Sequence, residues 1–143
     1  MKKYEFLEHT ADIKFRARGK DLNEAFENCV LAICDFISKG QKIKHARGEV
    51  VNVSGRDKKE LLYNFLEEIL VLLDSKGFLT ASANVQVLGN TIKAEFFGDD
   101  VENYSGLDPI KAPTFAEMYV REVSGSDVFD GGSGWEIQAV MDV

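Results

Sequence analysis

Two short polar groups, one near each end of the 143-residue chain, carry residue types that could do chemistry. The run Glu8-His9-Thr10-Ala11-Asp12 places two carboxylates, an imidazole and a hydroxyl within five residues. The second group is Asp142-Val143, at the end of an apolar run. Hard divalent cations prefer carboxylate and carbonyl oxygens as ligands. If the fold brings these groups together, we expect a cation site formed by Asp12, Asp142 and a main-chain oxygen of Val143.

Each of these residues also has an ordinary structural interpretation. Short acidic turns are common, so Asp12 could simply cap the segment that follows it. His9 could transfer a proton near neutral pH, but a single histidine more often packs against its neighbours. A terminal aspartate such as Asp142 is usually just solvated. However, the apolar alternation over residues 135–141 predicts a strand that would hold Asp142 in a sheet.

Two further polar features could contribute to a site. Lys111 is followed by Ala112-Pro113-Thr114-Phe115; such a lysine usually forms a surface salt bridge, but it could contact a phosphate or a partner. Glu67 and Glu68 lie on an otherwise apolar helix, so one must face solvent or a polar site. The chain has no nucleophile elbow and no phosphate-binding glycine loop. We therefore predict no catalytic set.

Composition and charge narrow the class of function. The content of 45% hydrophobic and 29% charged residues fits a single globular domain over residues 1–143. No apolar stretch approaches the ~20 residues that span a bilayer, and no secretory signal is present, so we expect a cytoplasmic protein without membrane contact. The net charge of −7, without a basic run, disfavours direct RNA or DNA binding. An acidic surface would suit a basic protein partner.

The two cysteines, Cys29 and Cys34, are five residues apart on a predicted helix. This spacing fits neither a disulfide nor a CxxC redox pair, and no ligand spacing fits zinc. We expect both side chains to be small buried apolar groups.

Hydrophobic periodicity predicts the elements that must position these residues. Helices are expected from Asp21 to Lys39-Gly40 and from Asp57 to residues 74–77, with Gly40 as the C-cap of the first. Strands are expected at residues 13–18, 50–53, 78–88, 91–97, 114–123 and 135–141. Gly89-Asn90 forms a hairpin turn, residues 98–109 an acidic connection and residues 124–134 a flexible glycine-rich loop. The sum is an α+β fold with two amphipathic helices packed on one side of a largely antiparallel sheet.

A local pattern occurs twice. Gly19-Lys20-Asp21-x-x-Glu24-x-x-x-Asn28 recurs 36 residues later as Gly55-Arg56-Asp57-x-x-Glu60-x-x-x-Asn64. Both segments could simply use the same helix-start chemistry, because such caps are common. The alternative is an internal duplication of a strand–helix unit, although two copies are too few for a solenoid.

Four of these motifs together resemble the signature of the archease family. They are Glu8-His9-Thr10-Ala11-Asp12, the helix segment Leu61–Leu70 containing Glu67-Glu68 with Asp74 beyond it, the segment Lys111–Phe115, and the terminal Asp142-Val143. The resemblance covers essentially the whole chain, with the motifs in the family's order and at similar spacing.

The resemblance implies an accessory protein of the GTP-dependent RNA-splicing ligase that joins tRNA exon halves. Such a protein promotes guanylylation of the ligase and multiple turnover, and meets RNA only through the ligase. It implies a divalent cation, often Ca²⁺ and otherwise Mg²⁺ or Mn²⁺, held by Asp12, Asp142 and Val143. It also points to Lys111 as a contributor, and we expect His9 and Glu68 to be functional contacts.

The chain departs from the family pattern at two places. The family commonly has a histidine directly after the aromatic residue of the lysine motif, where this chain has Ala116. The acidic loop from Gly98 to Asp108 also lacks a histidine. A role for those histidines in cation binding or ligase contact therefore does not carry over to this protein.

Two other classes of function stay open on the sequence. One is a metal-dependent hydrolase that uses Asp12, Asp142 and His9. The other is a chaperone or modulator of RNA-processing proteins that does not touch nucleotide chemistry. The sequence predicts no oligomeric state.

Overall fold

The computed structural model describes residues 2–9, 11–125 and 132–143. Seven strands and two long helices make up the described chain, with one short 3-10 helix, η1 (Val101–Asn103). In chain order the strands and helices are β1 (Tyr4–Leu7), β2 (Asp12–Gly19), α1 (Leu22–Ser38), β3 (Arg47–Ser54), α2 (Lys58–Lys76), β4 (Phe78–Leu88), β5 (Thr91–Asp100), β6 (Ala112–Ser124) and β7 (Ser133–Asp142).

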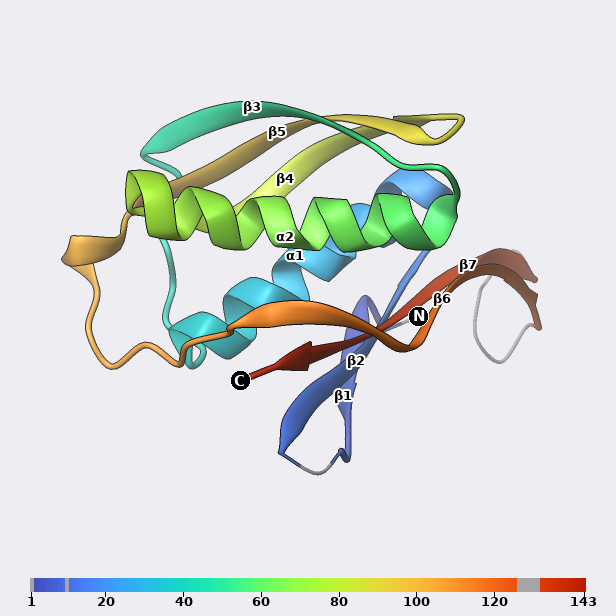
Figure 1. Ribbon diagram of the computed structural model, residues 1–143, viewed down its shortest axis with the longest axis horizontal. Helices are drawn as coiled ribbons and strands as arrows, with labels where there is room; N and C mark the ends of the chain where they lie inside the picture. Colours follow the sequence, from blue (N-terminus) through green and yellow to red (C-terminus); the bar gives the residue numbers. More distant parts are fainter. Residues whose placement is uncertain (1, 10, 126–131) are drawn as a thin grey trace.

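The strands form two sheets, with the orders β1-β2-β7-β6 and β3-β5-β4. Every strand pairing in both sheets is antiparallel. Figure 1 shows the two helices between the sheets, and each helix packs against strands of both. The predicted α+β class and the antiparallel pairing are confirmed. The expectation that both helices lie on one side of a single sheet is wrong, because the strands divide into two sheets that enclose the helices.

The helix starts follow the predicted cap chemistry. The Asp21 side chain accepts a hydrogen bond from the backbone N–H of Glu24, and Asp57 does the same for Glu60. At the other end of α1 the predicted glycine cap is wrong by one residue. Lys39 itself adopts the left-handed conformation there, with φ 54°, and donates its N–H to carbonyls of the last turn. Helix α2 ends at Lys76, and its C-cap is Gly77, whose φ of 61° favours glycine.

The repeated pattern extends beyond the caps into contacts between strand and helix. The Asn28 side chain donates to the carbonyl of Arg18 at 2.6 Å, and the Asn64 side chain donates to that of Ser54 at 2.9 Å. Since an asparagine to strand bond is not part of cap chemistry, this match favours the duplication of a strand–helix unit.

A glycine precedes both helix starts for the same packing reason. A Cβ added at Gly19 would lie 2.3 Å from the backbone nitrogen of Ala25, and one at Gly55 would lie 2.4 Å from that of Leu61. Real Cβ contacts are never this short, so only glycine lets each strand run this close to its helix.

The apolar faces of the helices meet in one core. The rings of Phe26 and Phe65, from α1 and α2, pack edge to face with centroids 5.2 Å apart, and both side chains are fully buried. Cys29 is also fully buried and Cys34 partly so; burial raises the pKa of both thiols. No disulfide joins them, as predicted. Within the described residues no helix is long and apolar enough to span a bilayer.

Several element boundaries differ from the prediction. Strand β1 was not predicted; it pairs with β2 and forms one edge of the four-stranded sheet. Strand β3 is longer than residues 50–53, and β5 continues through Asp100 into the predicted acidic connection. Part of the predicted glycine-rich loop, residues 126–131, lies outside the described residues.

Candidate functional site

The register of β2 against β7 places the two motif aspartates opposite each other. Asp12 is the first residue of β2, Asp142 is the last of β7, and they are direct cross-strand partners. Directly opposed residues of an antiparallel pair project to the same face, with Cβ atoms about 5 Å apart. We call these two side chains the carboxylate pair. The prediction that the two motifs meet in space is confirmed.

His9 lies beside the carboxylate pair, in the segment between β1 and β2. Its Nδ1 is 3.5 Å from a carboxylate oxygen of Asp12, and its Nε2 is 2.9 Å from a carboxylate oxygen of Glu117. The Nδ1 atom is buried and has no hydrogen-bond partner among the described residues. The imidazole is therefore bracketed by two carboxylates that come from distant parts of the chain.

Glu117 also belongs to this site, although it was not among the predicted site residues. Its carboxylate also accepts a hydrogen bond from Lys14 Nζ at 3.0 Å, so it ties His9 and β2 to β6. These hydrogen bonds, from Lys14 first and His9 second, hold the pKa of the Glu117 carboxyl below its usual value. No local motif marked this glutamate, because its partners lie more than 100 residues away in the sequence.

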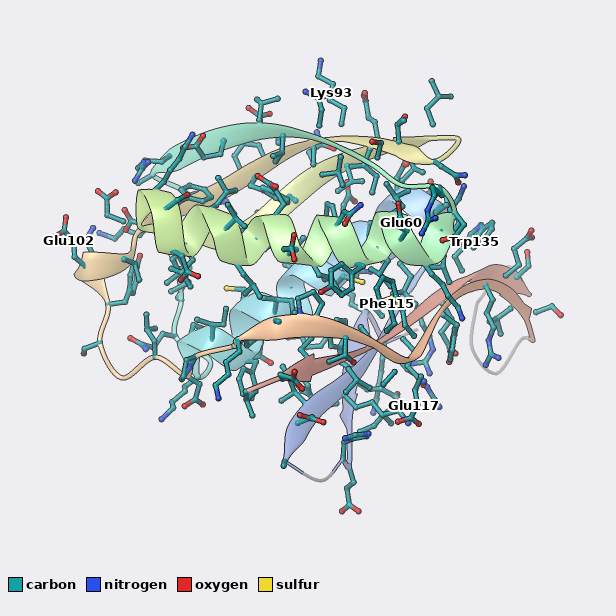
Figure 2. All side chains as sticks on the ribbon, in the orientation of Figure 1. Glu60, Lys93, Glu102, Phe115, Glu117 and Trp135 are labelled. Atoms are coloured by element: carbon teal, nitrogen blue, oxygen red, sulfur yellow. The ribbon has the colours of Figure 1, made fainter. Side chains whose placement is uncertain are left out.

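An irregularity in β6 brings Glu117 to this position. Between the paired positions Thr114 and Tyr119, strand β6 has four residues where β7 has only Ala139. We call residues 115–118 the β6 bulge. Glu117 has a φ of 54°, in the left-handed region that a glutamate enters only at an energetic cost. Figure 2 shows Phe115 just below α2 and Glu117 on the other side of β6.

The other predicted site residues lie at different distances from the carboxylate pair. The Lys111 side chain is exposed, while its backbone N–H donates to the Asp142 carbonyl at 2.8 Å. Val143 is the residue after Asp142, and its side chain is 41% exposed. Glu68 is half-buried on α2 and forms no hydrogen bond or ion pair with any described residue. The structure thus joins Lys111 to the site through its backbone, while Glu68 forms no hydrogen bond or ion pair with the described residues of the site.

The donor set of the site is small for a metal. Among the described residues, no group of three or more histidine, cysteine, aspartate or glutamate side chains is arranged to hold an ion. The two carboxylates are hard oxygen ligands of the type that Ca²⁺ and Mg²⁺ prefer. The Asp142 carbonyl accepts a hydrogen bond from the Lys111 N–H, and Val143, the next residue, brings further main-chain oxygens to this strand end. The chemistry of this set fits a hard cation that keeps several water ligands.

The same face of the sheet continues as a network of paired charges. Arg18 Nε donates to the buried Glu136 at 2.9 Å, and its Nη1 donates to Glu5 at 3.1 Å. Burial opposes ionisation of Glu136, but hydrogen bonds from Tyr119 and Arg18 outweigh it and lower its pKa. These charges are neutralised within the sheet, in contrast to the carboxylate pair.

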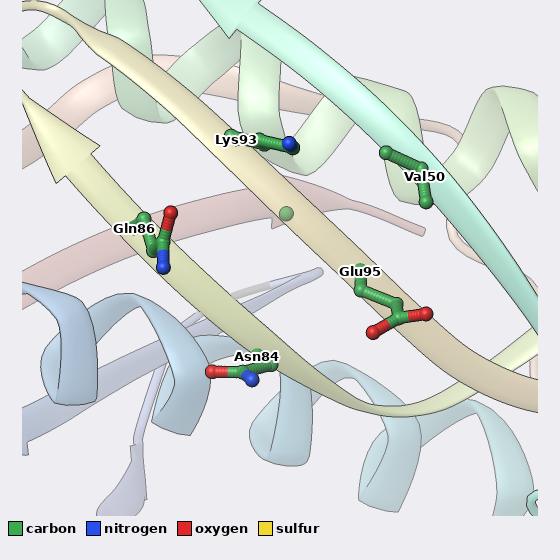
Figure 3. Close-up of a pocket in the computed structure, with 6 residues that line it drawn as sticks. Val50, Asn84, Gln86, Lys93 and Glu95 are labelled. Atoms are coloured by element: carbon green, nitrogen blue, oxygen red, sulfur yellow. The ribbon is translucent and has the colours of Figure 1, made fainter.

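A separate hollow of about 300 Å³ lies on the outer face of the β3-β5-β4 sheet (Figure 3). It is lined by Val50, Asn84, Gln86, Lys93, Ala94 and Glu95. Figure 3 shows these side chains spread along three neighbouring strands. They include no serine, cysteine or histidine, and only one of them is a carboxylate. This hollow therefore offers less chemistry than the carboxylate pair.

Comparison with known proteins gives a consistent result over nearly the whole chain. Residues 4–143 match the family described as Archease protein family (MTH1598/TM1083). The chain is 36% identical to protein archease of Pyrococcus abyssi over 149 aligned positions, which cover all of both chains. It is 35% identical to protein archease of Sulfurisphaera tokodaii over 125 positions, covering 85% of this chain and 90% of the relative.

A solved structure has the same fold. It is the solution structure of Methanobacterium thermoautotrophicum protein 1598, which matches with a TM-score of 0.76 and 27% sequence identity. The match covers all of both chains. The arrangement of two helices and antiparallel sheets is therefore shared.

Proposed function

The chain belongs to the archease family, and from this premise we propose that it is an accessory protein that activates a GTP-dependent RNA ligase. In this proposal it promotes guanylylation of the ligase and so permits multiple turnover. The protein contacts the ligase, and RNA is met only through that partner. The net charge of −7 supports this division of roles, because it disfavours binding to phosphate backbones.

The carboxylate pair is the observation that carries the proposal. Like charges directly opposite each other in an antiparallel sheet destabilise the pairing. Asp12 and Asp142 occupy such a position, and neither forms an ion pair with a lysine or arginine among the described residues. A sheet that needed only stability would not keep two aspartates here. A bound cation would remove the repulsion, so the arrangement supports a role in holding one.

Asp12 and Asp142 would hold the ion, with Val143 as a further oxygen donor. A divalent cation in this place supplies positive charge that can neutralise phosphate oxygens during nucleotidyl transfer. The chain itself fixes the position of the two carboxylates through the β2–β7 register, and His9 Nδ1 lies 3.5 Å from an Asp12 carboxylate oxygen. Lys111 presents an exposed ammonium group next to the same strand end.

Activation requires that the protein bind the guanylylation-competent state of the ligase more tightly than other states. A helper with equal affinity for both states would shift nothing. The proposed role is therefore to dock beside the nucleotide pocket of the ligase and favour that state, with the carboxylate pair facing the pocket.

A turnover assay with the purified cognate ligase tests this proposal. Wild-type protein should raise the number of ligation events per ligase, while Asp12→Ala and Asp142→Ala should lose most of this stimulation. Glu95→Ala is the matched control, because Glu95 is an exposed carboxylate on the other sheet. Normal stimulation by both aspartate variants would show that the mechanism is wrong.

One observation favours a second candidate function, a metal-dependent hydrolase. His9 lies between the carboxylates of Asp12 and Glu117, an arrangement in which an imidazole can exchange protons. A hydrolytic activity of the protein alone, lost in His9→Ala, would support this candidate. Full stimulation of the ligase by His9→Ala, without any hydrolysis by the wild type, would rule it out.

A further inference from the structure

One face of α2 remains exposed in the fold and carries an unusual mixture of side chains. Tyr63, Glu67, Val71 and Asp74 follow one another at helical spacing, so they lie along one stripe of the helix. We call these four residues the α2 stripe. Val71 is 44% exposed, and both carboxylates are exposed. The stripe thus alternates apolar and acidic side chains on a surface that faces away from the core.

Strand β6 adds a second aromatic residue to this stripe. The rings of Phe115 and Tyr63 stack with centroids 4.3 Å apart and planes 10° from parallel. Phe115 is nevertheless 56% exposed, although a phenylalanine normally gains free energy from full burial. The stack covers one face of the ring and leaves much of the side chain in solvent. Figure 2 shows Phe115 at the seam between α2 and β6.

The carboxylates of the stripe are not needed by the helix itself. Glu67 and Asp74 form no ion pair with any described residue, whereas Glu60 on the same helix pairs with Arg56 at 2.8 Å. Asp74 lies in the last turn, where the helix dipole disfavours a negative charge. Their charge is therefore available to a group outside the chain.

The geometry points to the α2 stripe with Phe115 as the docking surface for an arginine-bearing basic segment of the RNA ligase. This inference rests on the proposed function and names the face through which it acts. An RNA ligase must carry basic surface to hold its phosphate-rich substrate, and this chain has a net charge of −7. A guanidinium group can stack on an aromatic ring while it pairs with a carboxylate, which a lysine does less well.

The position of this surface suits activation of the ligase. Phe115 is three residues along β6 from Ala112, which is the cross-strand partner of Asp142. Three residues of strand span about 10 Å. Phe115 lies on the α2 side of β6, whereas the carboxylate pair lies on the outer face of the sheet. Because β6 is the edge strand, a partner seated on Phe115 would reach the carboxylate pair by extending around this edge. The β6 bulge connects the two regions, because Phe115 contacts α2 and Glu117 contacts His9.

Binding of the purified ligase to designed variants tests the inference. Phe115→Ser removes the exposed ring, and Glu67→Lys reverses one charge of the stripe. Each should weaken binding about tenfold or more, as expected for a central contact of an interface. The matched controls are Leu88→Ser, which is 81% exposed at the end of β4, and Glu95→Lys on the outer sheet face. Both controls should bind like the wild type.

A second measurement does not depend on how well the variants fold. A photo-crosslinking amino acid placed at position 115 should attach to the ligase, at an arginine-containing peptide identified by mass spectrometry. The same group at position 88 should not. Added salt should weaken wild-type binding more than that of Glu67→Lys, because ionic contacts are screened.

The outcomes separate this inference from the proposed function. Wild-type affinity in folded Phe115→Ser and Glu67→Lys proteins, with stimulation of the ligase intact, would overturn the docking surface and leave the proposed function standing. A wild-type protein that neither binds nor stimulates the ligase would overturn both. Crosslinking from position 115 together with the loss of affinity supports the surface.

Discussion

The two strand–helix units of the molecule have the same local construction but different surroundings. In each, a glycine lets the strand pass close to the helix, an aspartate caps the helix, and an asparagine bonds back to the strand. The first unit, β2 and α1, places its strand inside a four-stranded sheet. The second unit, β3 and α2, places its strand at the edge of the other sheet.

The difference shows where the chemistry comes from. Asp12 at the start of β2 faces Asp142, whereas the position 36 residues later, Gly48 of β3, faces Phe97. His9 likewise corresponds to His45, whose ring stacks on Phe97, whereas the His9 ring lies between the carboxylates of Asp12 and Glu117. The repeated unit supplies a scaffold, and the partner strand β7 converts one copy of it into a candidate site.

Substitution of the two glycines should give the largest loss of folding stability, and the loss should be similar in the two units. Gly19→Ala and Gly55→Ala should each lower the free energy of unfolding by about 3 kcal/mol, because the new methyl group would collide with helix backbone. Urea unfolding at neutral pH measures this. Gly48→Ala is the control, since its nearest contact would be an ordinary 3.7 Å. A change at only one of the two glycines would break the equivalence of the units.

Bound calcium should stabilise the protein through the carboxylate pair at the start of the first unit, with no counterpart in the second unit. At a Ca²⁺ concentration of 100 times Kd, ligand binding should stabilise the wild-type protein by about 2.7 kcal/mol. In Asp142→Asn this stabilisation should vanish, while the metal-free protein should gain about 0.5 kcal/mol from the loss of like-charge repulsion. Thermal unfolding with calcium and with chelator measures both effects. A calcium effect that survives in Asp142→Asn would place the ion elsewhere.

The buried ion network is a further contrast between the units, because Arg18 faces Glu136 where Ser54 of the second unit faces Thr91. Glu136→Gln should lower the free energy of unfolding by about 2 kcal/mol at pH 7, because it leaves Arg18 without its buried carboxylate partner. Folding lowers the pKa of the Glu136 carboxyl below its ordinary value of 4.5. The ionised carboxylate therefore contributes its full stabilisation above pH 4.5, and this contribution is lost as the pH falls through the lowered pKa. The variant and the wild type should therefore converge in stability in acid, which urea unfolding at several pH values would measure.

Removal of the helix caps should give the smallest loss of folding stability, and the loss should be equal for the two helices. Asp21→Ala and Asp57→Ala should each cost about 1 kcal/mol, because each aspartate accepts one hydrogen bond from a helix N–H that would otherwise lack a partner. Unfolding in urea compares the two variants directly. Asn substitutions at the same positions should restore most of the loss, since the amide oxygen can accept the same bond.

The sequence predicted the parts of the fold that depend on neighbouring residues. Helix starts at Asp21 and Asp57 were recognisable because cap and first turn lie within four residues. The hairpin turn at Gly89-Asn90 was recognisable for the same reason. Strand β1 was missed because its four residues give too short a pattern for a periodicity.

The candidate site was predictable only in part. The types of Asp12 and Asp142 suggested a cation site, and the structure places them opposite each other. Glu117 was not predictable, since it depends on the β6 bulge and on partners in β2 and before it. Lys111 joins the site through a backbone N–H, which no side-chain pattern can reveal.

The sequence by itself determined the composition of the units: two capped amphipathic helices, alternating strands, and acidic residues at the two ends of the chain. These follow from side-chain chemistry acting over a few residues. Only the tertiary structure decided the division into two sheets, the β2–β7 register and the bulge that carries Phe115 and Glu117. The reason is that strand pairing joins segments up to 130 residues apart, and its register depends on how the whole core packs.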